Sequence, residues 1–269
     1  MSFSISGKTA IVTGAANGIG LAIARHFVDQ GANVVFADRD EAALLHEVGE
    51  NTNDEATARI FAGDLREKLT IENLLSFTLD AFDRVDILVN ASRQFGLTDV
   101  HNRDDDSVDL LLQQNMGCAM QLSQRIAARM IKQAEGNEDD RDQIGSIVNL
   151  SSIAASMTNP DLMGFSIAAA AMNQMTRSMA VSLAPNRIRV NAVAVGSMMS
   201  ASLMTKLQGS EEMRETITEH TPLGRIALAS EVAGVVQFLS SEAASFVTGQ
   251  VISADGGRSL LDPVKLSQH

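Results

Sequence analysis

The chain has 269 residues, of which 45% are hydrophobic and 20% charged, with one cysteine, four prolines and neither tyrosine nor tryptophan. Apolar content this high can build a sizeable core without disulfides or metals, which excludes a disordered chain, a collagen-like repeat and a disulfide scaffold. The formal charge of −12 disfavours nucleic acid and anionic membranes as partners and favours small molecules or other subunits. The absence of tyrosine excludes any mechanism that needs a phenol.

Apolar runs rich in β-forming residues alternate with segments of helical period along the chain. The expected strands are 9–13, 33–38, 58–62, 85–90, 146–151, 188–195 and 251–254. The expected helices are 19–30, 41–50, 67–82, 105–133, 165–183 and 230–240. Strands 85–90 and 146–151 are apolar on both faces, as in a parallel sheet covered by helices on both sides. We predict an α/β fold with one doubly wound Rossmann-type domain over 1–269 and about seven parallel strands.

Two segments depart from this alternation. Residues 135–142 are acidic and are expected to form a solvated loop. Residues 196–221 form a long connection rich in Met and Ser at the carboxyl end of a strand, where an open α/β sheet carries its ligand crevice. We expect a mobile lid over the substrate there; the alternative is a segment that packs on the surface or on a partner.

The location of the protein follows from what the sequence lacks. The amino terminus has no charged region followed by an apolar run and a cleavage site, and no apolar stretch approaches the ~20 residues that span a bilayer. The single Cys118 cannot form an intramolecular bridge, which fits a reducing compartment. We expect a cytoplasmic protein, bound to neither membrane nor nucleic acid.

Residues 13–20, TGAANGIG, join the first strand to the first helix. Their glycines allow a tight turn and close approach to a pyrophosphate, which the helix N-terminus attracts. Asp38 ends the second strand, where a dinucleotide fold places the acid that binds an adenosine ribose. A carboxylate would repel a 2′-phosphate, so we predict NAD rather than NADP. Arg39 offers a partial offset, but we expect it to face solvent.

The same segment resembles the TGxxxGIG signature of the short-chain dehydrogenase/reductase family, and the resemblance covers nearly the whole chain. Further matches are GSIVNLSS at 145–152, RIRVNAV at 187–193, TGQ at 248–250 and DGG at 255–257. The resemblance implies hydride transfer between a nicotinamide cofactor and an alcohol or carbonyl compound, in a homodimer or homotetramer, and we expect no metal. It assigns to the cofactor Gly14, Asn17, Gly18, Ile19, Gly20, Asp38, Arg39, Asp64, Leu65, Asn90, Ala91, Gly196 and Ser200.

The resemblance fails at two catalytic positions. In the family a Tyr transfers the proton, and a Lys four residues later on the same helical face lowers its pKa. The alignment of 163–193 places Phe165 at the Tyr and Ala169 at the Lys. The substrate-orienting Ser is present as Ser152, and Asn115 stands where the family keeps an Asn that holds a relay water. Loss of a positioned general acid typically costs ~10²- to 10⁴-fold in rate.

Four other side chains are candidates to replace the missing Tyr as proton donor. Arg93 replaces a family Gly beside the expected nicotinamide, His101 and His220 lie in segments expected near the crevice mouth, and Asp161 precedes the altered helix. Nothing in their spacing aims any of the four at the reacting oxygen, so we expect each to be a solvated loop residue. A Ser-His-Asp hydrolase is weaker still, because Ser152 has no base partner visible in the sequence.

Two function hypotheses remain. The first is an NAD-linked oxidoreductase with a degenerate catalytic site and weak or absent activity by the family mechanism. The alternative is a non-catalytic NAD(H)-binding sensor or the inactive subunit of a hetero-oligomer. Met172, Met175 and Met179 form one helical stripe, expected in the core or at a subunit interface, with an adaptable apolar substrate pocket as the alternative.

Overall fold

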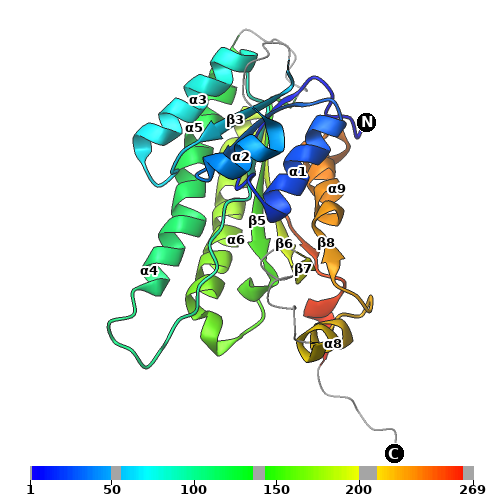
Figure 1. Cartoon of the computed structure of the whole chain (residues 1–269). Helices are drawn as coiled ribbons and strands as arrows, with labels where there is room; N and C mark the ends of the chain where they lie inside the picture. Colours follow the sequence, from blue (N-terminus) through cyan, green and yellow to red (C-terminus); the bar gives the residue numbers. More distant parts are fainter. Residues whose placement is uncertain (1, 50–55, 136–142, 200–210, 263–269) are drawn as a thin grey trace, which may run out of the picture.

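Parallel strands form the central sheet of the structure, a computed structural model that describes residues 2–49, 56–135, 143–199 and 211–262 (Figure 1). The strand order is β3-β2-β1-β4-β5-β6-β9, and every neighbouring pair is parallel. The strands are β1 Thr9–Thr13, β2 Asn33–Asp38, β3 Ala58–Ala62, β4 Ile87–Asn90, β5 Gly145–Ser152, β6 Ile188–Val195 and β9 Val251–Ala254. The predicted seven-stranded doubly wound fold is confirmed, with small shifts at strand ends.

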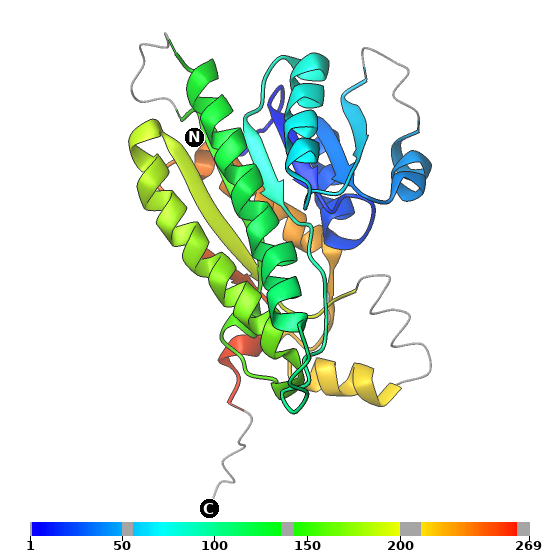
Figure 2. The ribbon, with the colours of Figure 1, turned by 90° about the vertical axis from the view of Figure 1, so that its left-hand side faces the viewer.

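Helices cover both faces of this sheet. Their bounds are α1 Gly18–Asp29, α2 Glu41–Val48, α3 Lys68–Phe82, α4 Ser107–Leu112, α5 Cys118–Gln133, α6 Met163–Leu183, α8 Glu211–Glu219 and α9 Ala229–Ser240. Helices α1 and α9 pack side by side on one face (Figure 1), whereas α3, α5 and α6 cover the other face, which is turned toward the viewer in Figure 2. In the described part of the chain, no helix combines the length and apolar character needed to cross a membrane.

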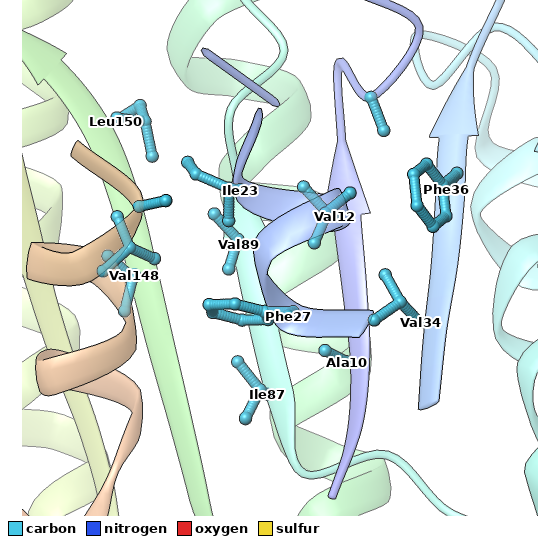
Figure 3. Close-up of a cluster of buried hydrophobic side chains, with 14 of the residues drawn as sticks. Ala10, Val12, Ile23, Phe27, Val34, Phe36, Ile87, Val89, Val148 and Leu150 are labelled. Carbon is cyan, nitrogen blue, oxygen red and sulfur yellow. The ribbon is translucent and has the colours of Figure 1, made fainter. Parts of the chain in front are cut away.

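The strands are buried on both sides, which explains their continuous apolar sequences. Along β1, Ala10 and Val12 point toward α1, where they meet Ile23 and Phe27 (Figure 3). Ile11, between them, points to the opposite face and belongs to the cluster that includes residues of α3 and α5. The sheet therefore lies between two cores and presents its strand ends, rather than its faces, to ligands.

The chain reverses its winding direction between β1 and β4. From β1 the chain proceeds to β2 and β3 on one side, and from β4 it proceeds to β5, β6 and β9 on the other. At such a switch point the loops that leave the two central strands diverge and open a crevice beyond the carboxyl ends of the strands. The candidate site lies there.

The predicted helix 105–133 is not a regular α-helix. Between α4 and α5 the chain makes a π-helical turn, Gln113–Gly117. A π turn is wider than an α turn, so it breaks the 3.6-residue period and changes the direction in which the following side chains point. The turn contains Asn115, whose side chain is buried. In the methionine stripe, Met172 and Met175 of α6 are buried against Ala119 of α5 and Met179 is partly buried beside them, while Met172 also lines a small cavity described below.

The predicted lid segment is described in part. Residues 200–210, and therefore Ser200, lie outside the described residues, as does most of the acidic run 135–142. The described part contains β7 Met198–Met199, which pairs with β8 Ala227–Leu228 in a separate two-stranded sheet, and it contains α8. These three elements are not predicted from the sequence, because two-residue strands are too short to show a hydrophobic period and α8 is strongly polar.

Candidate functional site

An open cleft of about 580 Å³ lies at the carboxyl ends of β1 to β4. This volume is within the range of small-molecule and cofactor sites. Most of the predicted cofactor residues line it, namely Gly14, Asn17, Gly18, Ile19, Gly20, Asp38, Arg39, Asp64, Leu65, Asn90 and Ala91. We call the part formed by the loops after β1, β2 and β3 the β1–β3 half, and the part formed by the loops after β4 and β5 with the start of α6 the β4–β5 half.

The turn after β1 requires glycine for steric reasons. Gly14 has a φ of +68°, and a Cβ built on it would lie 2.7 Å from Ser92 Cα. A Cβ on Gly20 would lie 2.1 Å from the carbonyl oxygen of Gly14. Helix α1 starts immediately beyond the turn, and the side chain of Asn17 makes no capping hydrogen bond to it. Backbone therefore borders this part of the cleft, next to a helix N-terminus whose dipole attracts anions.

Asp38 stands at the end of β2 and is held by backbone donors. Its Oδ1 accepts hydrogen bonds from the N–H groups of Arg39 (2.7 Å) and Asp40 (3.2 Å), and its Oδ2 accepts one from Ala16 (3.1 Å). These bonds orient the carboxylate at the border of the cleft. Because Oδ2 accepts only one of them, it retains the capacity to accept a further hydrogen bond from a ligand.

Asp64 follows β3 and forms an ion pair with Arg66. The Arg66 Nε lies 2.9 Å from Oδ1 and 2.8 Å from Oδ2, and the Arg66 Nη2 also donates to Oδ2. The hydrogen bonds from Arg66, with smaller contributions from its charge and that of Arg39, lower the pKa of Asp64 to about 2. The Asp64 carboxylate, expected to meet an adenine, therefore already accepts hydrogen bonds from within the protein.

The side chains of Asn90 and Asn115 form hydrogen bonds to other residues of the protein. Asn90 Nδ2 donates to Ser123 Oγ (2.9 Å) and Asn149 Oδ1 (2.8 Å) in a buried network across β4, α5 and β5. Asn115 pairs with the backbone of Gln94 in both directions, accepting from its N–H (2.7 Å) and donating to its carbonyl (2.8 Å). The π turn thus fixes the loop after β4. The predicted role of Asn115 in holding a water stays a prediction.

A second, small cavity of about 20 Å³ adjoins the cleft, roughly the space of one water molecule. Its lining contains Ser152 and Asn115 together with Phe165 and Ala169. The Ser152 hydroxyl is buried and accepts a hydrogen bond from the Ala154 N–H (3.2 Å). The structure thus brings together the four residues at the predicted catalytic positions.

Two side chains stand between the cleft and this cavity, because Arg93 and Phe165 line both. The Phe165 ring packs against that of Phe95, with centroids 5.5 Å apart and planes at 53°. Arg93 Nη1 donates a long hydrogen bond of 3.3 Å to the carbonyl of Ser151. Desolvation by the surrounding protein lowers the pKa of Arg93 to about 10, so its guanidinium remains charged at neutral pH. Among the described residues, it is the only ionisable side chain that lines the small cavity.

Three of the alternative proton donors lie outside the lining of the cleft and of the small cavity. His101, Asp161 and His220 line neither the cleft nor the small cavity. All three are exposed, and the Nδ1 of His220, directly after α8, lies 2.8 Å from the carbonyl of Thr216 in that helix. Gly196, predicted to touch the cofactor, also lines neither space. A Cβ there would lie 2.9 Å from Asp255 Cβ, so close packing against the segment after β9 explains this glycine.

Part of the cleft lining was not predicted from the sequence. Arg66, Gln94 and Phe95 line the cleft, as do Gln114 and Cys118. A signal existed for Arg66, since an acid followed two residues later by an arginine favours a local ion pair in a turn. No local signal marks the others, because the π turn and the course of the loop after β4 decide which side chains reach the cleft.

Comparisons with known proteins agree with this arrangement. A family profile described as enoyl-(acyl carrier protein) reductase matches residues 14–259. The 3-oxoacyl-(acyl-carrier-protein) reductase FabG of Thermotoga maritima is 33% identical over 94% of this chain and 98% of its own. Galactitol 2-dehydrogenase (L-tagatose-forming) of Cereibacter sphaeroides is 33% identical over 95% of this chain and 96% of its own.

A solved structure of a short-chain type dehydrogenase/reductase from Mycobacterium marinum superposes with a TM-score of 0.83. Its sequence is 27% identical, and the match covers 95% of this chain and 97% of that one. Fold, sequence and profile agree over nearly the full length. The chain therefore belongs to the short-chain dehydrogenase/reductase family of oxidoreductases, which bind nicotinamide cofactors.

Proposed function

We propose that the protein binds NAD(H) in its cleft and that hydride transfer by the usual mechanism of its family is weak or absent. The single observation that carries this proposal is the cavity beside Ser152. Phe165 and Ala169 line it where the family's Tyr and Lys are expected, and Arg93 is the only ionisable side chain that the described part of the chain contributes to it. A bound nicotinamide would carry the hydride, but no side chain there is a suitable proton donor at neutral pH.

The β1–β3 half of the cleft fits a dinucleotide. The turn at Gly14 and Gly20 leaves no space for a Cβ within the protein, its backbone borders the cleft, and the N-terminus of α1, which attracts a pyrophosphate, follows. Asp38 would accept a hydrogen bond from an adenosine ribose. These residues bind and orient the cofactor and need no proton transfer to do so.

Cofactor preference should follow the charge beside the ribose. Asp38 would repel the 2′-phosphate of NADP, which favours NAD. Arg66, a cation close enough to oppose this effect, is engaged by Asp64. Arg39 borders the cleft and is the counter-charge that could weaken the preference. We therefore propose NAD(H) over NADP(H).

The β4–β5 half supports binding better than proton transfer. The Ser152 hydroxyl is placed to donate a hydrogen bond to an oxygen, and the Arg93 guanidinium would stabilise negative charge near it. A guanidinium with a pKa of about 10 is a poor proton donor at pH 7. Phe165 retains an aromatic ring but has no titratable group.

The same observation favours a second candidate function. A protein that keeps the cofactor cleft but lacks the acid would act as a non-catalytic NAD(H)-binding sensor or as the inactive subunit of a hetero-oligomer. Members of this family are commonly oligomeric, and we propose a homodimer or homotetramer in the cytoplasm. We further propose residues 196–221 as a substrate lid.

Titration and reversion test these proposals. NADH fluorescence is a clear signal, since the chain contains no tyrosine or tryptophan. NADH should bind more tightly than NADPH, and failure of both to bind would refute the proposal. Turnover should then be screened with alcohols and ketones in the parent and in Phe165→Tyr with Ala169→Lys.

We expect a gain of ~10²- to 10⁴-fold in the double variant. Ala169→Lys alone is the matched control, because it restores a charge without an acid. Brisk turnover by the parent would contradict a degenerate site. A silent parent with an active double variant would support the non-catalytic candidate.

A further inference from the structure

Arg93 lines both the cleft and the small cavity, and it has no acidic partner among the described residues, whereas five other arginines do. Ion pairs with carboxylates are formed by Arg25, Arg66, Arg84, Arg125 and Arg225. Within the described ranges, no carboxylate forms an ion pair with Arg93, and desolvation alone shifts its pKa. A guanidinium has five N–H donors, and Arg93 directs one long hydrogen bond to the carbonyl of Ser151. Most of its donors therefore remain available to a ligand.

The carboxylates of the cleft lie at its opposite end. Asp38 ends β2 and Asp64 follows β3, whereas Arg93 follows β4. In the strand order β3-β2-β1-β4, β2 and β4 are two strands apart, which is roughly 10 Å. Asp38 and Asp64 also accept hydrogen bonds within their own half. The positive charge of Arg93 is thus not neutralised inside the cleft.

The loop that carries Arg93 is held in place at several points. Thr13 Oγ1 accepts hydrogen bonds from the N–H groups of Ala91 and Ser92, both at 3.1 Å. Asn115 holds Gln94 in both directions. Further along, the Thr98 hydroxyl accepts a hydrogen bond from the Gly164 N–H (3.0 Å) at the start of α6. A guanidinium on a fixed loop is preorganised, which reduces the entropy lost on binding.

Apolar and aromatic side chains form one part of the surroundings of Arg93, beside the polar Asn115, Ser151 and Ser152, and Arg93 itself is exposed in the open cleft. Phe95 and Phe165 pack together beside it, and Ala169 and Met172 contribute to the small cavity. An apolar lining strengthens an electrostatic contact and also accommodates a hydrocarbon body. The ligand that fits combines one negative charge with a short apolar portion.

From these observations we infer that Arg93 forms an anion-binding subsite at the β4–β5 end of the cleft, and that this subsite takes the carboxylate of a small organic acid. The planar fork of a guanidinium matches a carboxylate in two parallel hydrogen bonds. A carboxylate carries a single charge, equal and opposite to that of Arg93, whereas a phosphate monoester carries ≈ −1.5 to −2 at pH 7. The inference rests on the proposed binding of NAD(H) in the other half, because it names the substrate class of the same site.

The test compares acids with their uncharged amides. Benzoate and benzamide, and butyrate and butyramide, should be titrated by calorimetry into the protein with and without saturating NADH. We expect each acid to bind at least ~10-fold more tightly than its amide, which corresponds to about 1.4 kcal/mol. Equal binding of acid and amide would overturn the inference, as would inorganic phosphate displacing benzoate with equal affinity.

Variants then assign the effect to Arg93. Arg93→Met should reduce the preference for the acid to within about twofold, and Arg93→Lys should retain part of it, because lysine keeps the charge without the fork. Arg103→Met is the matched control, since Arg103 is an exposed arginine of the same connection that lines neither space, and it should leave the preference unchanged. An Arg93→Met protein that keeps the full preference would also overturn the inference.

Two failures remain distinguishable. If NADH does not bind but acids are still preferred over amides, the proposed function fails and the subsite stands. If NADH binds and acids are not preferred, the subsite fails and the proposed function stands. Denaturant unfolding of the variants confirms that Arg93→Met is folded; because Arg93 makes only one long hydrogen bond, its replacement should change stability little.

Discussion

The two halves of the cleft are lined by different parts of the polypeptide, backbone in one half and side chains in the other. The β1–β3 half is made largely of backbone: a turn at Gly14 and Gly20 that leaves no space for a Cβ, and the carboxylate of Asp38 held by three backbone N–H groups. The β4–β5 half is made of side chains, with the Phe165 ring against Phe95 and the guanidinium of Arg93, which forms no ion pair with a carboxylate of the described ranges.

This difference determines what each half tolerates. A backbone turn fails when a single methyl group is added, so the β1–β3 half has few alternatives. A side-chain lining can change its chemistry and keep its packing, as an aromatic ring at position 165 and a small residue at 169 illustrate. We therefore expect changes in the first half to act on binding and folding, and changes in the second half to act on selectivity and chemistry.

The largest effect is expected from Gly20→Ala. The added Cβ would lie 2.1 Å from the Gly14 carbonyl oxygen, so the turn must shift. Overpacking of this kind costs about 1–3 kcal/mol, and displacement of the turn should weaken NADH binding by ~100-fold or more. The measurements are urea unfolding and NADH titration.

Gly234→Ala is the control for that substitution. Gly234 lies within α9, and a Cβ there meets nothing within 4 Å. Alanine is the better helix former, so this variant should gain about 0.5–1 kcal/mol and bind NADH as the parent does. A Gly20→Ala protein with parental NADH affinity would show that the backbone turn does not contact the cofactor.

The next effect concerns Asp38. Asp38→Asn keeps the shape of the side chain and removes the charge that would repel a 2′-phosphate. We expect the ratio of NADPH to NADH affinity to rise by ~10-fold or more, since like charges brought together cost several kcal/mol. Glu41→Gln, an exposed acid in the first turn of α2, should leave the ratio unchanged. An unchanged ratio in Asp38→Asn would place the adenosine ribose elsewhere.

Much of the first half could be predicted from sequence, because its determinants are local. The glycine spacing and the acid at the end of β2 lie in continuous segments whose period and position are readable, and the cleft lining contains both. The doubly wound parallel sheet also followed from simple rules, since apolar strands alternating with helices admit few topologies.

The second half depends on contacts between distant segments. The pairing of Asn115 with Gln94 requires the π turn, and no periodicity in 105–133 indicates that turn. The position of Arg93 near the expected nicotinamide was anticipated from its place after β4, but its lack of an acidic partner required the structure. Gly196 shows a second limit of local patterns: its assignment to the cofactor by resemblance stays a prediction, and only the structure shows its close packing against Asp255.

A smaller effect is expected from Asn115→Ala. The variant loses both hydrogen bonds to the backbone of Gln94, which should lower stability by about 1–2 kcal/mol and speed hydrogen exchange at the Gln94 amide. The looser loop should also weaken the preference of the Arg93 subsite for acids over amides. Asn102→Ala, which removes one exposed hydrogen bond to the Asp104 N–H, is the control and should change none of these.

The smallest expected effect concerns the ion pair between Asp64 and Arg66, in the β1–β3 half of the cleft. Arg66 lowers the pKa of Asp64 from 3.8 to about 2 by hydrogen bonds and by its charge. Because the folded-state pKa is depressed, the pair stabilises the protein above the unfolded pKa of about 3.9 and this contribution is lost as the pH falls toward 2. In Arg66→Gln, the Asp64 carboxyl resonance should titrate near 3.8, and the stability difference from the parent should vanish at the acid end.

Arg225→Gln provides the matched comparison outside the cleft. Arg225 likewise holds the pKa of Glu231 at about 2, so its removal should raise that pKa and leave both the pKa of Asp64 and NADH binding unchanged.

Arg66→Gln should differ from this control in its effect on NADH affinity. It frees the Asp64 carboxylate to accept a hydrogen bond from an adenine amino group, and NADH affinity should rise by about two- to threefold, since a single exposed hydrogen bond contributes roughly 0.5 kcal/mol. A fall in NADH affinity would instead mean that the Arg66 guanidinium itself contacts the cofactor, and that side chains as well as backbone build the β1–β3 half.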